Sequence, residues 1–310
     1  MTPAIGAWLR ERFPARNAAF FLALYLAALV VARAAVAPGA VTITWRDAAG
    51  FAAVWCFFLT LRIADEHKDF AADAVAHPQR VLQRGLITLR HLRLLGMIAV
   101  AAQVGISLWL DGGVGPVTRA WLLVFGWSAL MTREFFAGAW LRAHRMVYAL
   151  SHLLVMPLVA GWIATMGAPG AVLMPAVQSF AALAFLAAMA CEMARKLRAP
   201  GDEHPLAESY TQALGIPRAA VVLISVVLAA TSAAVLLTHI ATGDTSMADR
   251  LALGACAIAA TGALLRFVRR PTAAAAAVSE AAVGLAALAT QLVPLAAVLA
   301  SRGVAPGVTP

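Results

Sequence analysis

The feature that most constrains this chain is a series of long apolar runs, each about as long as a bilayer is thick. A helix needs about 20 apolar residues to cross ~30 Å of hydrocarbon. The chain is 62% hydrophobic and only 13% charged, so its apolar surface exceeds what one water-soluble core can bury. Open sheets would leave backbone groups unsatisfied in lipid, so we predict an all-α, polytopic integral membrane protein. The nine predicted spans are 18–37, 48–64, 92–110, 119–140, 147–166, 172–193, 219–240, 251–268 and 273–299.

Basic residues are divided unevenly between alternate loops. Most of the 24 Lys and Arg residues fall on one side, and the other side carries Arg46, Arg119, Arg250 and Arg302. Cytoplasmic loops carry the excess, which predicts a multi-pass inner-membrane protein with a cytoplasmic N-terminus and, after nine crossings, a C-terminus outside. Residues 5–16 mix apolar and charged side chains, as a helix lying on the inner leaflet does. The cations form no single stripe with stacking aromatics, so no nucleic-acid partner is expected.

The carboxylates are concentrated in two loops that this count places in the cytoplasm. Together the two loops hold eight of the 15 Asp and Glu residues. The first set is Asp65, Glu66, Asp69 and Asp73, and the second is Glu192, Asp202, Glu203 and Glu208. If the second helix continues past Asp65, its acids share one face. Such carboxylates repel one another unless a cation joins them, and Mg²⁺ binds through a few carboxylates together with substrate phosphates.

A basic element follows the first acid set. Arg80 and Arg84 are four residues apart in the segment 77–85, a spacing that suits two guanidinium groups holding phosphate oxygens. By themselves these arginines would fit the positive-inside bias. The simpler alternative for the acids is an exposed turn neutralised by Arg62 and Lys68.

Two stretches resemble a known family. DEHKDFAAD, residues 65–73, resembles the NDxxDxxxD signature of the UbiA superfamily of intramembrane prenyltransferases, and HPQRVLQRGLIT, residues 77–88, resembles its HPxRPLxxGxIS continuation. The resemblance covers essentially the whole chain. It implies nine helices around a central cavity, forming one transmembrane domain over 18–302 between an interfacial segment, 1–17, and a tail, 303–310. It also implies Mg²⁺-dependent ionisation of an isoprenyl diphosphate.

The chain departs from the family pattern at both motifs. Asp65-Glu66 stands where the family has Asn-Asp. The second motif, YDxxYAxxDxxxD, corresponds to CEMARKLRAPGDE at 191–203, where Ala199 replaces the middle Asp and Arg195-Lys196 replaces Tyr-Ala. This half of the site is therefore expected to hold diphosphate partly through direct cation contacts.

The resemblance implies the following roles. The metal ligands are Asp65, Glu66, Asp69, Asp73, Glu192, Asp202 and Glu203. The diphosphate-binding residues are Lys68, Arg80, Arg84, Arg195, Lys196 and Arg198, and the catalytic residues among all of these are Asp69, Arg195 and Lys196. The candidates for the substrate cavity are Tyr148, His152 and Gln178.

Simpler roles stay open for several of these residues. Glu192 can form an ion pair with Arg195 or Lys196 along one helix, worth only ~0.2–0.5 kcal/mol. Polar groups between membrane helices are more often structural hydrogen bonds than catalytic groups. Glu134, at the end of the fourth run, is either at the cavity rim or an interface anchor.

Three functions are compatible with these patterns. The resemblance favours transfer of the prenyl group to an aromatic or other lipophilic acceptor, and its alternative is a terpene cyclase that ionises the same diphosphate without an acceptor. A non-enzymatic transporter or scaffold could use the basic loops to bind an anionic lipid. Such a protein would gain nothing from carboxylates beside its ligand, so the acid set favours an enzyme.

Overall fold

The computed structural model describes residues 2–15, 17–203 and 209–307. The chain divides into two compact units, and each is described by itself. The first unit comprises Met1–Tyr25, Ile43–Tyr148 and Pro306–Pro310, and the second comprises Leu26–Thr42 and Ala149–Ala305. Helices α2 (Asn17–Val36) and α8 (Arg145–Leu153) each contribute residues to both units.

The first unit is built on three long helices, α3 (Trp45–Lys68), α5 (Leu89–Asp111) and α6 (Pro116–Thr132). Helix α5 packs against both α3 and α6. The short helices of this unit are α1 (Thr2–Arg12), α4 (Phe70–Ala76), η1 (Glu134–Phe136) and α7 (Gly138–Ala143). Helix α1 buries Trp8 completely, in a core cluster with Phe13, Leu59, Ile63 and Leu82. The N-terminal helix therefore packs on the protein, whereas the sequence predicted only an interfacial role for it.

Local hydrogen bonds explain where these helices begin and end. The side chain of Asp47 accepts a hydrogen bond from the Thr44 N–H at 2.7 Å at the start of α3, and Thr88 caps the first turn of α5. Helix α5 ends at Asp111 and is followed by Gly112, whose φ of 68° is the left-handed conformation that glycine adopts without strain. The carboxylate of Asp111 then accepts from the backbone N–H groups of Gly115, Val117 and Thr118, which satisfies the first turn of α6.

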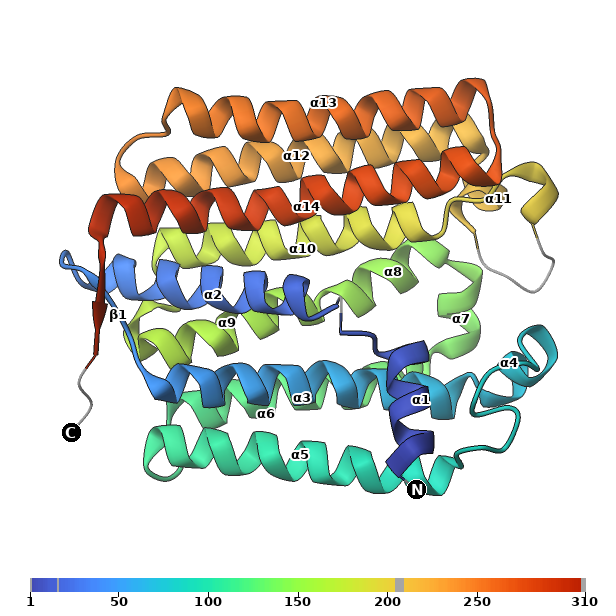
Figure 1. Cartoon of the computed structure of the whole chain (residues 1–310), viewed down its shortest axis with the longest axis horizontal. Helices are drawn as coiled ribbons and strands as arrows, with labels where there is room; N and C mark the ends of the chain where they lie inside the picture. The colour runs from blue at the N-terminus through green and yellow to red at the C-terminus, as the bar shows by residue number, and fades with distance from the viewer. Residues whose placement is uncertain (1, 16, 204–208, 308–310) are drawn as a thin grey trace. The chain divides into compact units, whose positions relative to one another are not determined.

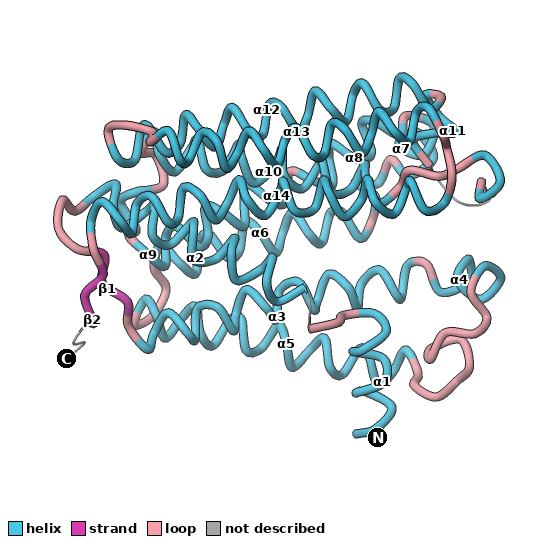
Figure 2. The backbone as a smooth tube through the Cα atoms, turned by 45° about the horizontal axis from the view of Figure 1, so that its top comes forward, coloured by secondary structure: helices cyan, strands magenta, loops and turns pink. Residues whose placement is uncertain are grey.

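The second unit contains a group of long helices that pack side by side (Figure 1). They are α10 (Pro175–Arg195), α12 (Ile216–Thr242), α13 (Met247–Arg269) and α14 (Ala273–Arg302), with α9 (Val155–Gly167) against α10. A Cβ added at Gly167 would lie 2.9 Å from the Leu29 carbonyl oxygen, so a glycine is required where the end of α9 meets α2. The shorter elements are η2 (Pro169–Ala171), η3 (Pro200–Asp202) and α11 (Tyr210–Leu214). Strands β1 (Val41–Ile43) and β2 (Val304–Pro306) pair in a two-stranded sheet (Figure 2).

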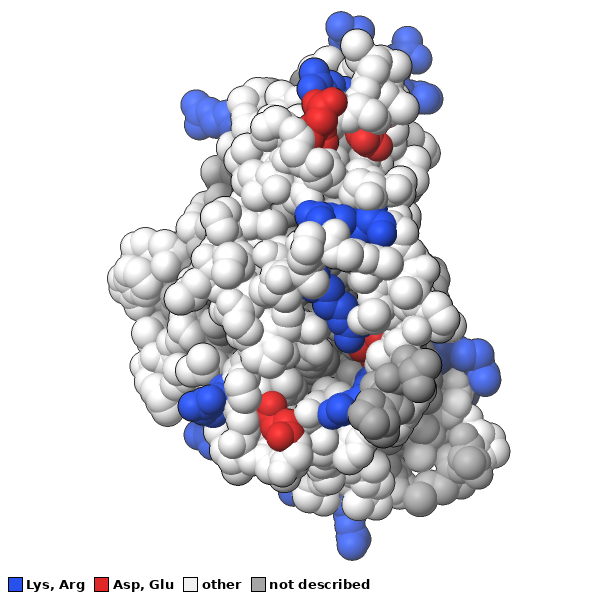
Figure 3. Space-filling view, turned by 90° about the vertical axis from the view of Figure 1, so that its left-hand side faces the viewer, with Lys and Arg blue, Asp and Glu red and all other residues white. Residues whose placement is uncertain are grey.

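Eight helical segments in the described residues are long and apolar enough to cross a membrane. They confirm a mostly helical, multi-pass membrane protein, although the predicted count of nine is not reached. The run predicted over 119–140 forms α6, which has 17 residues and ends at Thr132. Three consecutive residues with positive φ, Glu134, Phe135 and Phe136, follow it. In the view of Figure 3, Lys, Arg, Asp and Glu side chains occur in small groups separated by uncharged surface.

Candidate functional site

The first acid set lies where α3 passes into α4. The backbone bends at Asp69 (φ −95°, ψ 4°), yet the Asp69 N–H still donates to the Asp65 carbonyl and the Asp73 N–H to the Asp69 carbonyl, both at 2.8 Å. The helical hydrogen-bond pattern therefore continues past Asp65, beyond the end of the predicted span at residue 64, which is the condition for these acids to share one face.

Glu66 is the most deeply buried of these acids. Its side chain is 1% exposed, and its Oε1 atom accepts from Arg12 Nε and from Arg62 Nη2, both at 2.6 Å. Arg12 belongs to α1, 54 residues earlier in the chain. Sequence reasoning missed Arg12 as a member of the site, because no local spacing links the two residues.

Asp73 is also held by cations. Its Oδ2 atom accepts from Arg80 Nη1 at 2.5 Å and lies 3.7 Å from Arg12 Nη2. Arg80, predicted to bind diphosphate, is thus paired with a carboxylate of the acid set in this structure. Asp65 is more open, with a side chain that is 58% exposed and 3.8 Å from Arg62.

Lys68 connects the end of α3 to two later elements of the first unit. Its ammonium group lies 2.9 Å from Glu134 Oε1 and donates to the Tyr148 hydroxyl at 2.6 Å. The same group lies 5.1 Å from the centre of the Tyr148 ring, within range of a cation–π interaction. Glu134 and Tyr148 therefore lie beside Lys68, next to the acid set. The left-handed turn that follows α6 contains Glu134.

Asp69 differs from its neighbours. Among the described residues, nothing forms a hydrogen bond or an ion pair with its carboxylate. Burial raises the pKa of the Asp69 carboxyl above its usual value, Lys68 opposes the rise, and the charges of Asp73, Glu66 and Glu134 add to it. The site thus contains one carboxylate whose charge an added cation would stabilise.

The basic loop is tied to α1 and to the core. Glu11 accepts a hydrogen bond from the Val81 N–H at 3.1 Å, and Leu82 and Ile87 are buried in the cluster that contains Trp8. Arg84 is exposed, and the described residues provide it with no side-chain partner. This arginine is therefore open to a ligand, in contrast to Arg80.

The second acid set, in the second unit, forms the local ion pairs that the simpler alternative predicted. Glu192 lies 2.5 Å from Arg195 Nη2 and 2.9 Å from Lys196 Nζ. Arg198 donates from Nη1 to the backbone carbonyls of Arg195 and Leu197, both at 2.9 Å, so it closes the C-terminal end of α10.

The rest of this set stabilises the following loop. Glu203 accepts hydrogen bonds from the hydroxyls of Ser209 and Thr211, and Ser209 in turn caps α11. Asp202 is exposed in η3. Glu208 lies outside the described residues.

Two of the cavity candidates have local roles within the second unit. Gln178 donates to the Val172 carbonyl at 2.6 Å. It is exposed near the start of α10, fourteen residues, or about 21 Å along the helix axis, from Glu192. The Nδ1 atom of His152 lies 3.3 Å from the neighbouring Ser151 hydroxyl. The second unit thus does not bring Gln178 to the acids at the end of α10.

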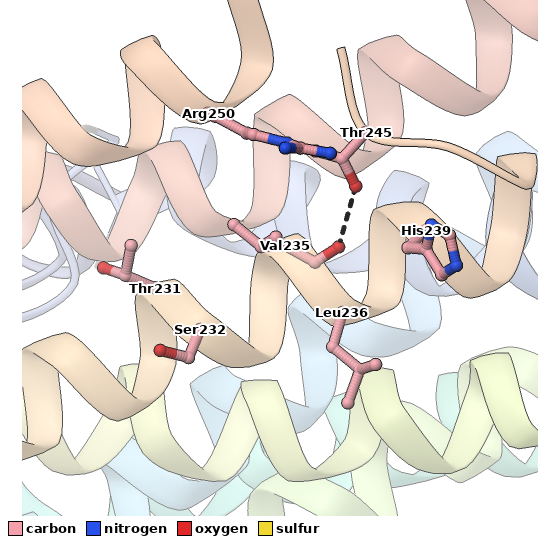
Figure 4. A pocket seen from close by; sticks show the side chains of 7 residues that line it. All are labelled: Thr231, Ser232, Val235, Leu236, His239, Thr245 and Arg250. Atoms are coloured by element: carbon pink, nitrogen blue, oxygen red, sulfur yellow. Dashed lines mark hydrogen bonds between the residues drawn. The ribbon is translucent and has the colours of Figure 1, made fainter. Parts of the chain in front are cut away.

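A separate pocket of about 390 Å³ lies in the second unit, on α12 and the start of α13 (Figure 4). The residues that line it are Thr231, Ser232, Val235, Leu236, His239, Thr245 and Arg250. Its Thr245 hydroxyl donates to the Val235 carbonyl at 3.1 Å. None of the residues predicted for diphosphate or metal lines this pocket.

The surroundings of the carboxylate oxygens indicate which of the acids could bind a metal ion. No group of three or more His, Cys, Asp and Glu side chains is gathered for a metal within the described ranges. Mg²⁺ does not need one, because it binds through one or two carboxylates plus phosphate oxygens and water. Asp69, with the exposed Asp65 one turn before it, fits this requirement. Glu66, enclosed by two guanidinium groups, does not.

The comparisons with known proteins concern the fold. No family model and no curated protein matches the chain. A solved structure, described as giving "Structural and mechanistic insights into the biosynthesis of Digeranylgeranylglyceryl phosphate synthase in membranes", is similar with a TM-score of 0.65 and 12% identity. The match covers 96% of this chain and 99% of that one. The chain therefore shares the fold of that membrane protein over almost the full length of both.

Proposed function

We propose that the chain is an intramembrane prenyltransferase that ionises an isoprenyl diphosphate and transfers the prenyl group to a lipophilic acceptor, such as one with an aromatic ring. The observation that carries the proposal is the carboxylate of Asp69, which has no ion-pair partner among the described residues and is adjacent to Lys68 at the end of α3. The UbiA-like motifs around it and the fold shared with the synthase structure support the same conclusion. The acid set would face the cytoplasm, with the N-terminus on that side.

We propose Asp69 and Asp65 as the first ligands of Mg²⁺, with Asp73 joining them once Arg80 turns to the substrate. When bound, Mg²⁺ would neutralise charge on the diphosphate oxygens and so make diphosphate a better leaving group. The protein's own part is to hold these oxygen donors at the end of α3.

Lys68, Arg80 and Arg84 are proposed to hold the diphosphate. Breaking the allylic carbon–oxygen bond leaves a carbocation on the prenyl chain and the electron pair on the diphosphate. Cations that contact the departing anion more closely than the intact ester lower the barrier. The acceptor then forms a bond to the cationic carbon and loses a proton. An apolar surrounding of membrane helices would keep water from capturing the cation first.

The cations of the second acid set form a separate part of the proposal. Arg195 and Lys196 would contact diphosphate only after exchanging Glu192 for it, and Arg198 would contribute through its remaining N–H groups. Glu203, already bonded to two hydroxyls, would keep its loop in place.

The test is incubation of the purified protein in lipid with farnesyl or geranylgeranyl diphosphate, with and without Mg²⁺. Diphosphate release that requires both Mg²⁺ and an added phenol or quinone precursor is the expected result. Release without an acceptor, with a hydrocarbon or alcohol as product, would instead identify a cyclase. A protein that binds the diphosphate but releases nothing under any condition would be a non-enzymatic binder.

A further inference from the structure

Arg12, Glu66 and Arg62 form a network at the inner side of the acid set. Both guanidinium groups contact the same oxygen, Glu66 Oε1, at 2.6 Å. The side chains of Arg12 and Arg62 are 18% and 24% exposed, and that of Glu66 is 1% exposed. A buried carboxylate is stable only when cations or hydrogen bonds compensate it. Here two arginines do so at Oε1, whereas the buried Oε2 atom has no hydrogen-bond partner in the described part of the chain.

The surroundings of Glu66 are unsuitable for a divalent cation. Mg²⁺ keeps several waters when it binds to proteins, and a side chain with 1% exposure leaves little space for them. A metal at Glu66 Oε1 would also have to displace two positive groups or lie beside them. These surroundings argue against the role of metal ligand that the sequence predicted for Glu66.

Arg12 reaches a second acid. Its Nη2 atom lies 3.7 Å from Asp73 Oδ2, while its Nε atom bonds Glu66. The same helix is held by the buried Trp8 and by the contact of Glu11 with the Val81 N–H. Helix α1 is thus connected to the acid set and to the basic loop at once.

These contacts determine which acid stays open. Ion pairs compensate Glu66, Asp73 and Glu134, and Asp69 is left without one in the described part of the chain. We propose that Glu66 is the anchor of α1 rather than a metal ligand, and that Arg12 is a positioning residue that holds the acid set so that Asp69 receives the metal. This inference rests on the proposed function, because it concerns the same metal site.

The test measures binding of Mn²⁺, which takes the same oxygen donors as Mg²⁺, by electron paramagnetic resonance with inorganic diphosphate present. The variants are Glu66→Gln, Asp69→Asn and Arg12→Ala. The matched control is Arg10→Ala, which removes the same charge from an exposed position of the same helix. Both the affinity and the number of sites are measured, since a merely structural loss lowers the number of sites and a positioning loss lowers the affinity.

We expect Glu66→Gln to bind Mn²⁺ within about threefold of the wild type and Asp69→Asn to lose at least about tenfold, the range typical of lost ligands and their supporting contacts. Arg12→Ala should lose about tenfold at an unchanged number of sites, and Arg10→Ala should match the wild type. Equal losses in Glu66→Gln and Asp69→Asn would make Glu66 a ligand. If Arg12→Ala and Arg10→Ala bound Mn²⁺ with equal affinity, Arg12 would not be a positioning residue of the site.

Glu66→Gln leaves two partly buried cations without their carboxylate and can fail to fold. The double variant Arg12→Gln/Glu66→Gln avoids this by removing the acid with one of its partners. It should bind Mn²⁺ as well as Arg12→Gln alone, and a further tenfold loss would overturn the inference.

Trypsin accessibility of α1 separates this inference from the proposed function. Arg12→Ala should speed cleavage at Arg10, whether or not the protein is an enzyme, because α1 loses its anchor. A wild type that neither binds Mn²⁺ nor releases diphosphate, yet shows this change in cleavage, would overturn the proposed function and the metal role while keeping the anchor. Unchanged cleavage would overturn the anchor itself.

Discussion

The Lys68 ammonium group lies 2.9 Å from Oε1 of Glu134, which is the first of three consecutive residues with positive φ. Its second partner, the Tyr148 hydroxyl, is 2.6 Å away. The lysine next to Asp69 therefore already has two partners within the protein. A diphosphate bound as proposed would have to compete with Glu134 for this cation.

Removing the competitor should strengthen substrate binding. Glu134→Gln is expected to lower the KM for prenyl diphosphate about threefold, because partly exposed ion pairs contribute about 0.2–1 kcal/mol. Lys68→Met should raise the same KM about tenfold, since it removes a charge-assisted hydrogen bond. Steady-state kinetics with one donor and saturating acceptor measures both. If Glu134→Gln raised the KM as much as Lys68→Met does, Glu134 would be part of the substrate or metal site.

The left-handed turn predicts a stabilising substitution. Phe136 has a φ of 58° and is 80% exposed, so its side chain adds little packing to a strained backbone. Phe136→Gly should raise the free energy of unfolding by about 1 kcal/mol, the cost of this conformation for an L-residue less the extra chain entropy of glycine. Thermal unfolding in detergent measures the change. Phe136→Ala is the control, which removes the same ring without relieving the backbone, and equal stabilisation by both variants would mean that strain is not the cause.

Local patterns in the sequence predicted local structure well. The i, i+3 and i+4 spacing made both a helical continuation past Asp65 and ion pairs of Glu192 with Arg195 and Lys196 possible, the latter as the simpler alternative to a role in the site, and the structure contains both. The long apolar runs predicted the membrane helices to within a few residues at most ends. These features depend on neighbours along one helix, which the sequence alone specifies.

Features set by tertiary contact could not be predicted in the same way. Arg12 and Glu66 are 54 residues apart, and Lys68 and Tyr148 are 80 apart, so no periodicity relates them. The end of α6 at Thr132 is also unmarked, because residues 133–137 contain neither glycine nor proline. Its backbone turns there in a conformation that these residue types seldom adopt, and the contact between Glu134 and Lys68 accompanies it.

The two arginines of the basic loop should behave differently. Arg84 is exposed without a described partner, whereas Arg80 is bonded to Asp73. Arg84→Ala should therefore raise the KM for prenyl diphosphate about tenfold and leave thermal stability unchanged, since it removes only a ligand contact. Arg80→Ala should affect both KM and stability, because it also leaves Asp73 with less compensation. The control is Arg90→Ala, an exposed arginine at the start of α5, which should change neither quantity.

Asp69→Asn should lose turnover and gain thermal stability. Burial and neighbouring carboxylates raise the pKa of Asp69. A carboxyl whose pKa is higher in the folded state favours folding when protonated, and this contribution is lost as pH rises through the folded-state pKa. Ionised Asp69 therefore costs stability at pH 7, so Asp69→Asn should unfold at a higher temperature than the wild type there when EDTA is present. The two should converge at pH values below the usual carboxyl range.

Added Mg²⁺ should make the unfolding temperature of the wild type higher than that of Asp69→Asn. With diphosphate present, Mg²⁺ is expected to raise the unfolding temperature of the wild type by mass action and to leave Asp69→Asn unchanged. Turnover should be lost in the variant at every Mg²⁺ concentration, because the carboxylate that the ion would neutralise is gone. Thermal unfolding with and without Mg²⁺, at pH 7 and in the acidic range, measures both effects. A variant that is less stable than the wild type in EDTA, or that is stabilised equally by Mg²⁺, would show that the Asp69 carboxylate is already compensated within the protein.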